Sequence, residues 1–137
     1  MNRVPVVIVD DSDADRYIVK RRLSKSGGFG EVKEARDGVV FLEDFFNCPG
    51  RDKIEDTPLL VLMDVNMPGL NGFETIEELQ RRVALGEGPA SLVVMMFTSS
   101  SNPEDLALAE NLASVKGYIQ KPLDEAGIEK ILEIYHA

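Results

Sequence analysis

The chain has 137 residues, of which 28% are charged, and a formal net charge of −9 at pH 7. This length favours one self-sufficient domain, and the acidic balance argues against direct binding to nucleic acid, which needs clustered Lys and Arg. No apolar stretch approaches the roughly 20 residues that span a bilayer, the start lacks a signal-peptide layout, and the single cysteine, Cys48, excludes an internal disulfide. We therefore expect a cytoplasmic protein without membrane insertion.

Strand and helix patterns alternate along the chain. Continuous apolar runs bounded by turn residues predict strands at residues 6–9, 59–63 and 92–97, residues 31–35 are a short and less apolar strand candidate, and residues 115–120 are expected to form the fifth strand. Apolar positions at helical spacing predict helices over 12–26, 38–46 and 73–84, from 103 onward, and with an apolar face from 123 to 135. Five strand and helix pairs in strict alternation predict an α/β fold, a parallel sheet with helices on both faces.

Asp64 directly follows the third predicted strand. In an open α/β sheet, ligand and reaction sites gather at the carboxyl edge, where the connecting loops leave a crevice. Asp64 is therefore a candidate nucleophile or metal ligand. The alternative is an Asp that caps a turn before Pro68.

A second acidic group follows the first predicted strand. Residues 6–9 end in Asp10 and Asp11, so two strands would deliver three carboxylates to one edge of the sheet. Such a cluster repels itself unless a hard divalent cation binds it, and Mg²⁺, or Mn²⁺, suits oxygen ligands. Taken alone, the acidic pair also fits a helix start, because Ser12 and Asp15 have capping-box spacing.

The last two predicted strands end in residues that suit a bound oxyanion. Thr98, Ser99, Ser100 and Ser101 follow the fourth strand, and Lys121 with Pro122 follows the fifth. A hydroxyl and an ammonium group can both donate to a tetrahedral oxyanion. Each signal has a simpler alternative, since hydroxyl residues commonly cap helices and an exposed lysine is commonly solvated.

These residues together resemble the receiver domain of two-component response regulators. The resemblance rests on Asp10–Asp11, on Asp64 with Asn66–Gly69, on Thr98, and on Tyr118 three residues before Lys121–Pro122, and it covers essentially the whole chain. It implies a flavodoxin-like (βα)5 three-layer fold with strand order 2-1-3-4-5. The chain is most similar in size to stand-alone CheY-like receivers, which implies a single receiver domain over residues 1–137 without an output domain.

The resemblance implies a role for each site residue. Asp64 would accept a phosphoryl group from a sensor histidine kinase or a histidine phosphotransfer protein. The side chains of Asp11 and Asp64 and the backbone carbonyl of Asn66 would bind Mg²⁺, with Asp10 acting indirectly. Lys121 and Thr98 would bind the phosphoryl oxygens. The chain would then catalyse only its own phosphorylation and dephosphorylation.

The resemblance also implies a switch. Phosphorylation would draw Thr98 toward Asp64 and let Tyr118 turn inward, which would change the face of the fourth helix, fifth strand and fifth helix that binds a target protein. The bond before Pro122 would be cis. Residues near the phosphoryl group would set its lifetime, and these are Asn66, Ser99 and Ser100.

Two other functions stay open. The chain could be a phosphorelay shuttle or phosphate sink, although His136, its only histidine, lies at the extreme carboxyl terminus. It could also be a Mg²⁺-dependent phosphohydrolase with an aspartyl nucleophile, but Asn66 stands where such an enzyme needs an acid/base. The sequence also leaves open a phosphorylation-dependent homodimer and the role of the loops at 47–57 and 86–90.

Overall fold

The computed structural model describes residues 3–46, 58–87, 91–99 and 102–136. Its strands are β1 (Val4–Val9), β2 (Phe29–Ala35), β3 (Leu59–Met63), β4 (Leu92–Thr98) and β5 (Val115–Gln120). Its helices are α1 (Asp13–Ser26), α2 (Gly38–Phe46), α3 (Gly72–Ala84), α4 (Pro103–Glu110) and α5 (Glu125–Tyr135). Cys48, Ser100, Ser101 and the segments 47–57 and 88–90 lie outside the described residues.

The strands form one parallel sheet in the order β2-β1-β3-β4-β5, which confirms the predicted flavodoxin-like topology. At the carboxyl edge, Val9 of β1 pairs with Ala35 of β2 and with Met63 of β3, and Met63 pairs with Met96 of β4. The strand ends are therefore level, and the residues that follow them meet along one edge of the sheet.

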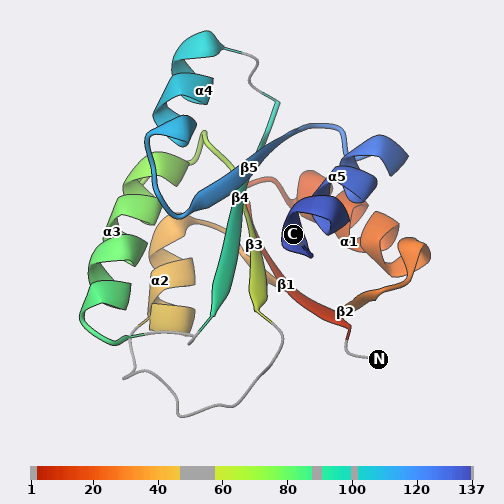
Figure 1. Ribbon diagram of the computed structural model, residues 1–137, viewed down its shortest axis with the longest axis horizontal. Coiled ribbons are helices and arrows are strands. Elements are labelled where there is room, and N and C mark those ends of the chain that lie inside the picture. The colour runs from red at the N-terminus through yellow and green to blue at the C-terminus, as the bar shows by residue number, and fades with distance from the viewer. Residues whose placement is uncertain (1–2, 47–57, 88–90, 100–101, 137) are drawn as a thin grey trace.

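Each face of the sheet carries its own apolar core, because successive side chains of a strand point to opposite faces. On one face, Val61 and Met96 pack in a core to which α2, α3 and α4 contribute. On the other face, Leu62 and Phe97 pack in a core to which α1 and α5 contribute. Figure 1 shows the resulting three layers, with α2, α3 and α4 on one side of the sheet and α1 and α5 on the other.

The first two strands begin two residues earlier than the sequence patterns predict. Val4 and Phe29 pair across β1 and β2, and they are only 2% and 5% exposed. Pro5 obscures this start, because it cannot donate to a strand ladder. The register of β1 and β2 shifts between Val4 and Val6, so the sheet accommodates Pro5 at an irregularity.

Side-chain caps fix where the later helices begin. Asn71 and Glu74 form a capping box at the start of α3, and Asn102 caps α4. Asp124 caps α5, so this helix begins at Glu125 and Leu123 lies before it. Leu123 is nevertheless buried in the core, which is why it appears in the apolar pattern of the helix.

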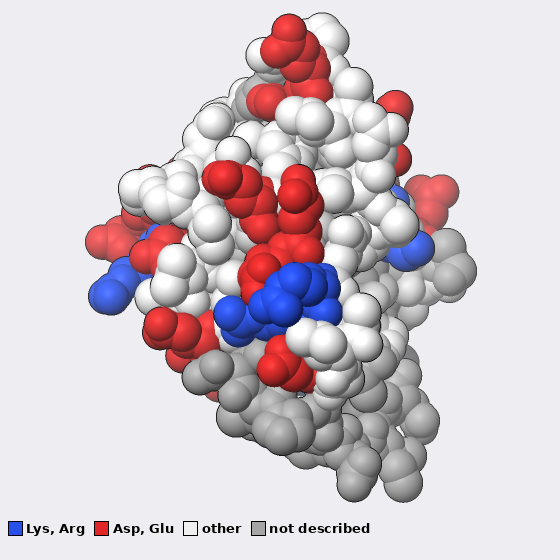
Figure 2. Space-filling view, turned by 90° about the vertical axis from the view of Figure 1, so that its left-hand side faces the viewer, with Lys and Arg blue, Asp and Glu red and all other residues white. Residues whose placement is uncertain are grey.

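Charged side chains on the α2, α3 and α4 side occur in mixed groups. Figure 2 shows acidic groups above and below a central basic cluster on this side. On α3, Arg81 and Arg82 contact Glu78 at 2.5 and 3.0 Å, so this helix pairs its own basic residues. In the part of the chain that the structure covers, no helix is both long enough and apolar enough to cross a membrane.

Candidate phosphoacceptor and cation site

Three residues that directly follow strands are fixed by backbone hydrogen bonds to the neighbouring strand. The amide of Asp10 donates to Ala35 at 3.0 Å, that of Asp64 donates to Val9 at 2.9 Å, and that of Lys121 donates to Thr98 at 2.9 Å. Each bond continues the parallel ladder by one step beyond the regular pairing. The sheet therefore sets the positions of the Asp10, Asp64 and Lys121 side chains.

Asp10, Asp11 and Asp64 come together at this edge. Each has a carboxylate oxygen within 4.8 Å of an oxygen of the other two. Asp10 and Asp64 are 1% and 6% exposed, whereas Asp11 is exposed to solvent. Oxygen donors of this kind are the ligands that a hard divalent cation prefers, and the exposed Asp11 leaves one side of the cluster open to solvent.

Lys121 is the cation that faces these carboxylates. Its Nζ lies 2.6 Å from Oδ2 of Asp10, 2.8 Å from Oδ2 of Asp15 and 3.7 Å from Oδ1 of Asp64. The same Nζ lies 5.4 Å from the centroid of the Phe97 ring, within the range of a cation–π contact. The ammonium group therefore hydrogen-bonds to Asp10 and Asp15, and it interacts with Asp64 only through a longer ion pair.

The surroundings of Asp64 make its ionisation costly. The pKa of Asp64 is raised from 3.8 to about 6, chiefly by burial and then by the charge of Asp10, with a smaller contribution from Asp11; Lys121 and the Val65 amide lower this pKa but do not offset the rise. Burial alone would lower the pKa of Lys121, but its hydrogen bonds to Asp10 and Asp15 and the charge of Asp64 raise it overall. Asp64 is therefore mostly ionised at neutral pH, although burial and the neighbouring carboxylates disfavour its ionised form. Lys121 stays positively charged.

The loop between β1 and α1 is held by hydrogen bonds to Asp10. The Ser12 amide donates to Oδ1 of Asp10 at 2.9 Å, and Arg16 donates to the Asp10 carbonyl at 2.6 Å. Arg16 also pairs with Glu34 at 3.2 Å and with Asp13. Arg16 therefore ties the acidic loop to β2 and to the start of α1.

The capping box considered for this helix start forms only in part. The Ser12 hydroxyl accepts a hydrogen bond from the Asp15 amide at 3.2 Å, as a cap requires. The reciprocal bond of a capping box would join the Asp15 carboxylate to the Ser12 amide. Instead, the Ser12 amide donates to Asp10, and the Asp15 carboxylate accepts from Lys121.

The loop after β3 approaches Asp64 closely. The Gly72 amide donates to the Val65 carbonyl at 2.9 Å, and a Cβ atom on Gly72 would lie 2.2 Å from the Asp64 carbonyl oxygen. Gly69 has a φ of 76°, which favours glycine. Asn66 is exposed in this loop, two residues after Asp64. The two glycines thus let the chain turn back tightly from Asp64 into α3.

The remaining predicted residues lie on β4, on β5 and beyond them. Thr98 is fully buried and Ser99 is exposed. Tyr118 is half-buried and pairs with Met96, so the Tyr118 and Thr98 side chains lie diagonally on the same face of adjacent strands. The bond between Lys121 and Pro122 is cis.

The sequence analysis missed two residues of this site, Asp15 and Arg16. Both lie in the first turn of α1, where an acidic residue is commonly explained by the helix dipole and a basic residue by solvation. The available signal was position, because α1 begins at the same sheet edge as Asp10 and its first turn faces the residues that follow the strands. In the structure, the Asp15 carboxylate accepts a hydrogen bond from Lys121, and Arg16 donates to the Asp10 carbonyl.

Comparisons with known proteins agree with this geometry. Residues 6–133 match the response regulator receiver domain family. The chain is 30% identical over 129 residues to the chemotaxis protein CheY1 of Helicobacter pylori, covering 94% of each chain. It is 26% identical over 128 residues to a probable methanogenesis regulatory protein, FilR2, of Methanothrix harundinacea, covering 93% of this chain and 78% of that protein.

The fold is shared with solved response regulators. A two-component response regulator from Cytophaga hutchinsonii superposes with a TM-score of 0.77 at 20% identity, over 99% of this chain and 100% of the other. The chain therefore belongs to the response regulator receiver domain family. It is a CheY-like receiver, and receivers of this kind are signalling proteins of two-component systems rather than classical enzymes.

Proposed function

We propose that this protein is a single-domain response regulator that accepts a phosphoryl group on Asp64 and signals through a protein-binding surface. The observation that carries the proposal is the position of Asp64. It is buried at the carboxyl edge of the sheet, beside two further carboxylates and facing Lys121. A structural aspartate would gain nothing from this crowding, whereas a phosphoacceptor needs the cation and the lysine that such a site attracts.

In the proposed reaction, an oxygen of ionised Asp64 attacks the phosphorus of an N-phosphohistidine on the donor protein. The new P–O bond forms as the P–N bond breaks, and the electron pair of that bond returns to the imidazole nitrogen, which takes up a proton from solvent. The product is an acyl phosphate on Asp64 and a free histidine. The protein's contribution is to position the carboxylate and to balance charge around the transferred group.

The residues present fit a hard divalent cation. Asp11 and Asp64 would hold Mg²⁺, or Mn²⁺, through their side chains and Asn66 through its backbone carbonyl. Asp10 would act indirectly, because its two carboxylate oxygens already accept from Ser12 and Lys121. When bound, the ion neutralises negative charge on the carboxylates and on the transferred phosphoryl group.

The switch would run from Thr98 to Tyr118. Thr98 is the last residue of β4, and Tyr118 lies diagonally from it on β5. The Thr98 hydroxyl and the Lys121 ammonium would donate to the phosphoryl oxygens, and Tyr118 would turn inward as Thr98 moves. Asn66 and Ser99, with Ser100, which lies outside the described residues, would influence how long the phosphoryl group lasts.

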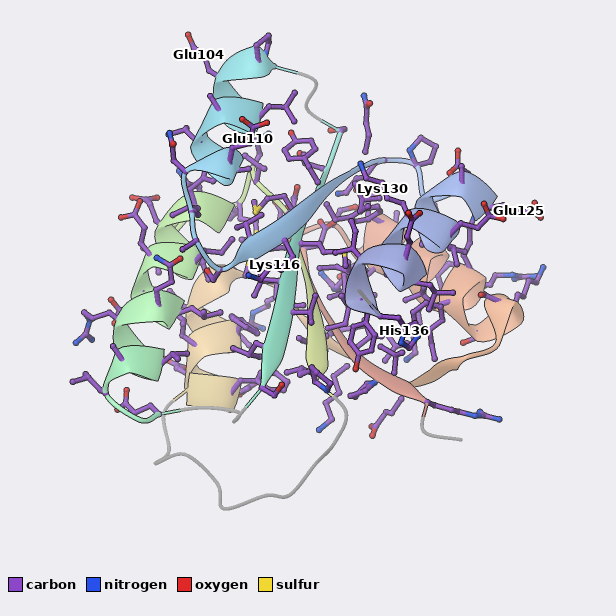
Figure 3. All side chains as sticks on the ribbon, in the orientation of Figure 1. Glu104, Glu110, Lys116, Glu125, Lys130 and His136 are labelled. Atoms are coloured by element: carbon purple, nitrogen blue, oxygen red, sulfur yellow. The ribbon has the colours of Figure 1, made fainter. Side chains whose placement is uncertain are left out.

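The face of α4, β5 and α5 is the proposed surface for a target protein. Leu106 and Leu108 of α4 are 38% and 50% exposed, and Lys130 of α5 donates to the Tyr118 carbonyl at 2.9 Å. Figure 3 shows Glu104 on α4 and Lys130 on α5, with β5 between these helices. α4 thus carries exposed apolar side chains as well as acidic ones, a mixed composition that suits a protein partner.

The upstream partner would be a sensor histidine kinase or a histidine phosphotransfer protein. The protein would meet this partner in the cytoplasm. A shuttle or phosphate-sink role uses the same chemistry without a target. His136 is a poor candidate for transferring a phosphoryl group within the chain, because it lies at the end of α5, where Figure 3 labels it. Its ring makes an edge-on contact with Tyr135. A homodimer through the α4, β5 and α5 face is an alternative use of that surface.

The test is labelling of Asp64 by a small phosphodonor. The wild-type protein, Asp64→Asn and the exposed control Asp44→Asn are incubated with acetyl phosphate and Mg²⁺, and the intact mass is measured. We expect one added phosphoryl group in the wild type and in Asp44→Asn, none in Asp64→Asn, and none in any sample when the ion is removed by chelation. Equal labelling of Asp64→Asn would overturn the proposal, and multiple turnover of a small phosphomonoester would favour a phosphohydrolase instead.

A further inference from the structure

Lys121 is held between two carboxylates, and only one of them belongs to the acidic cluster. Its Nζ donates to Asp10 at 2.6 Å and to Asp15 at 2.8 Å, and it stays 3.7 Å from Asp64, beyond hydrogen-bonding distance. We propose that Asp15 is a positioning residue that holds the Lys121 ammonium away from Asp64, so that an incoming phosphoryl group must compete with Asp15 for this lysine. The inference rests on the proposed function of Asp64.

The position of Asp15 is well defined by the backbone. Its amide donates to the Ser12 hydroxyl at the start of α1, and α1 packs on the sheet through Val19 and Leu23. The Asp15 carboxylate therefore projects from a rigid first helical turn toward Lys121, which follows β5. The contact joins residues that are 106 positions apart in the chain.

Asp15 is the weaker of the two partners of Lys121. The Asp10 side chain is 1% exposed, and its other oxygen accepts from the Ser12 amide. The Asp15 side chain is 40% exposed, so water can replace the ammonium at low cost. When a phosphoryl group binds Lys121, the contact with Asp15 is therefore the one that breaks.

The charge of Asp15 should weaken binding of a phosphoryl group to Lys121. A phosphoryl group on Asp64 offers several negatively charged oxygens to an ammonium group that already lies 3.7 Å from the carboxylate. Asp15 opposes this movement, because its own carboxylate loses a partner. Removal of the Asp15 charge should therefore favour binding of a phosphoryl group, whereas a merely structural role at the start of α1 predicts a less stable protein and weaker binding.

The experiment measures affinity for beryllofluoride, a tetrahedral mimic of a phosphoryl group on a carboxylate, at saturating Mg²⁺ by ¹⁹F NMR. We expect Asp15→Asn to bind it about two- to fivefold more tightly than the wild type, the range for a partly exposed ion pair. Asp15→Glu keeps the charge and should stay near the wild type. Asp13→Asn is the matched control, because Asp13 lies in the same turn of α1 and pairs with Arg16 rather than with Lys121.

A second readout follows Lys121 directly. The ¹⁵N signal of its ammonium group, in the protein without beryllofluoride, should shift in Asp15→Asn and stay unchanged in Asp13→Asn. An unchanged affinity or a weaker one in Asp15→Asn would overturn the inference, as would an equal gain in Asp13→Asn, which would indicate a general field effect. If the wild type does not bind beryllofluoride, or Asp64→Asn binds it equally well, the proposed function itself fails.

Discussion

Asp64→Asn should stabilise the metal-free protein at neutral pH. The pKa of Asp64 is raised from 3.8 to about 6, chiefly by burial and then by repulsion from Asp10. Because the folded-state pKa lies above the unfolded value, the unfolded chain loses its proton first as the pH rises. Ionisation of Asp64 therefore lowers stability between about pH 4 and pH 6, and the loss is complete above that window. The difference between 3.8 and about 6 corresponds to about 3 kcal/mol at pH 7.

The assay is urea unfolding followed by far-UV circular dichroism, since the chain contains no Trp. We expect Asp64→Asn to be more stable than the wild type by about 3 kcal/mol at pH 7 and by only about 0.5 kcal/mol at pH 4, where the folded wild type is protonated at this position. Asp44→Asn, an exposed change on α2, should stay within about 0.5 kcal/mol of the wild type at both pH values.

Magnesium provides a further arm of this experiment. The ion should stabilise the wild type more than Asp64→Asn, because only the wild type keeps all three carboxylates. A stability gain that is equal at pH 4 and pH 7 would refute the electrostatic reasoning. So would a loss of stability at pH 7, because it would mean that the 3.7 Å ion pair with Lys121 outweighs burial and repulsion.

Two further substitutions test the backbone around the site. Gly72→Ala would place a Cβ atom 2.2 Å from the Asp64 carbonyl oxygen, so we expect the free energy of unfolding in urea to fall by about 1–3 kcal/mol and phosphorylation to slow. Gly30→Ala is the control, because its Cβ atom would have its nearest neighbour at 3.4 Å and should change stability little. Equal losses of stability in the two variants would contradict this reasoning. Arg16→Met removes the donor to the Asp10 carbonyl, so we expect the free energy of unfolding to fall by about 1–3 kcal/mol and Mg²⁺ binding, measured by calorimetry, to weaken. Arg21→Met, at an exposed position of α1, is the control and should change neither quantity. Identical behaviour of the two variants would argue against a role for Arg16.

Local pattern predicts the fold well because most strands are buried on both faces. The run before Asp64 is continuously apolar, and its strand has the predicted bounds, Leu59–Met63. The pattern fails at Pro5, where tertiary pairing extends β1 through a residue that local rules exclude. It also underestimates β2, because Phe29 follows two glycines and only its burial shows that it belongs to the strand.

The candidate site was predictable only where residues directly follow strands. The sheet brings Asp10, Asp64 and Lys121 together, so their positions in the chain already imply their proximity. Asp15 has no such marker. Its carboxylate could have closed a capping box with Ser12, and only the arrival of Lys121 from the other end of the chain decides otherwise. Contacts between a helix side chain and a distant loop depend on packing angles that spacing does not encode.

The charges of the site fit the proposed reactivity of this edge. Asp10, Asp15 and Asp64 pair with the Lys121 ammonium, and Asp11 lies beside Asp10 and Asp64, so these carboxylates outnumber the one ammonium group that they share. Burial and then this negative charge raise the pKa of Asp64, and the negative charge is also what a divalent cation would neutralise. Lys121 does not hydrogen-bond to Asp64, because its Nζ lies against Asp10 and Asp15 and stays 3.7 Å from the Asp64 carboxylate. Under the proposed function, the free energy that the fold gives up here favours binding of the cation and movement of Lys121 toward a phosphoryl group on Asp64.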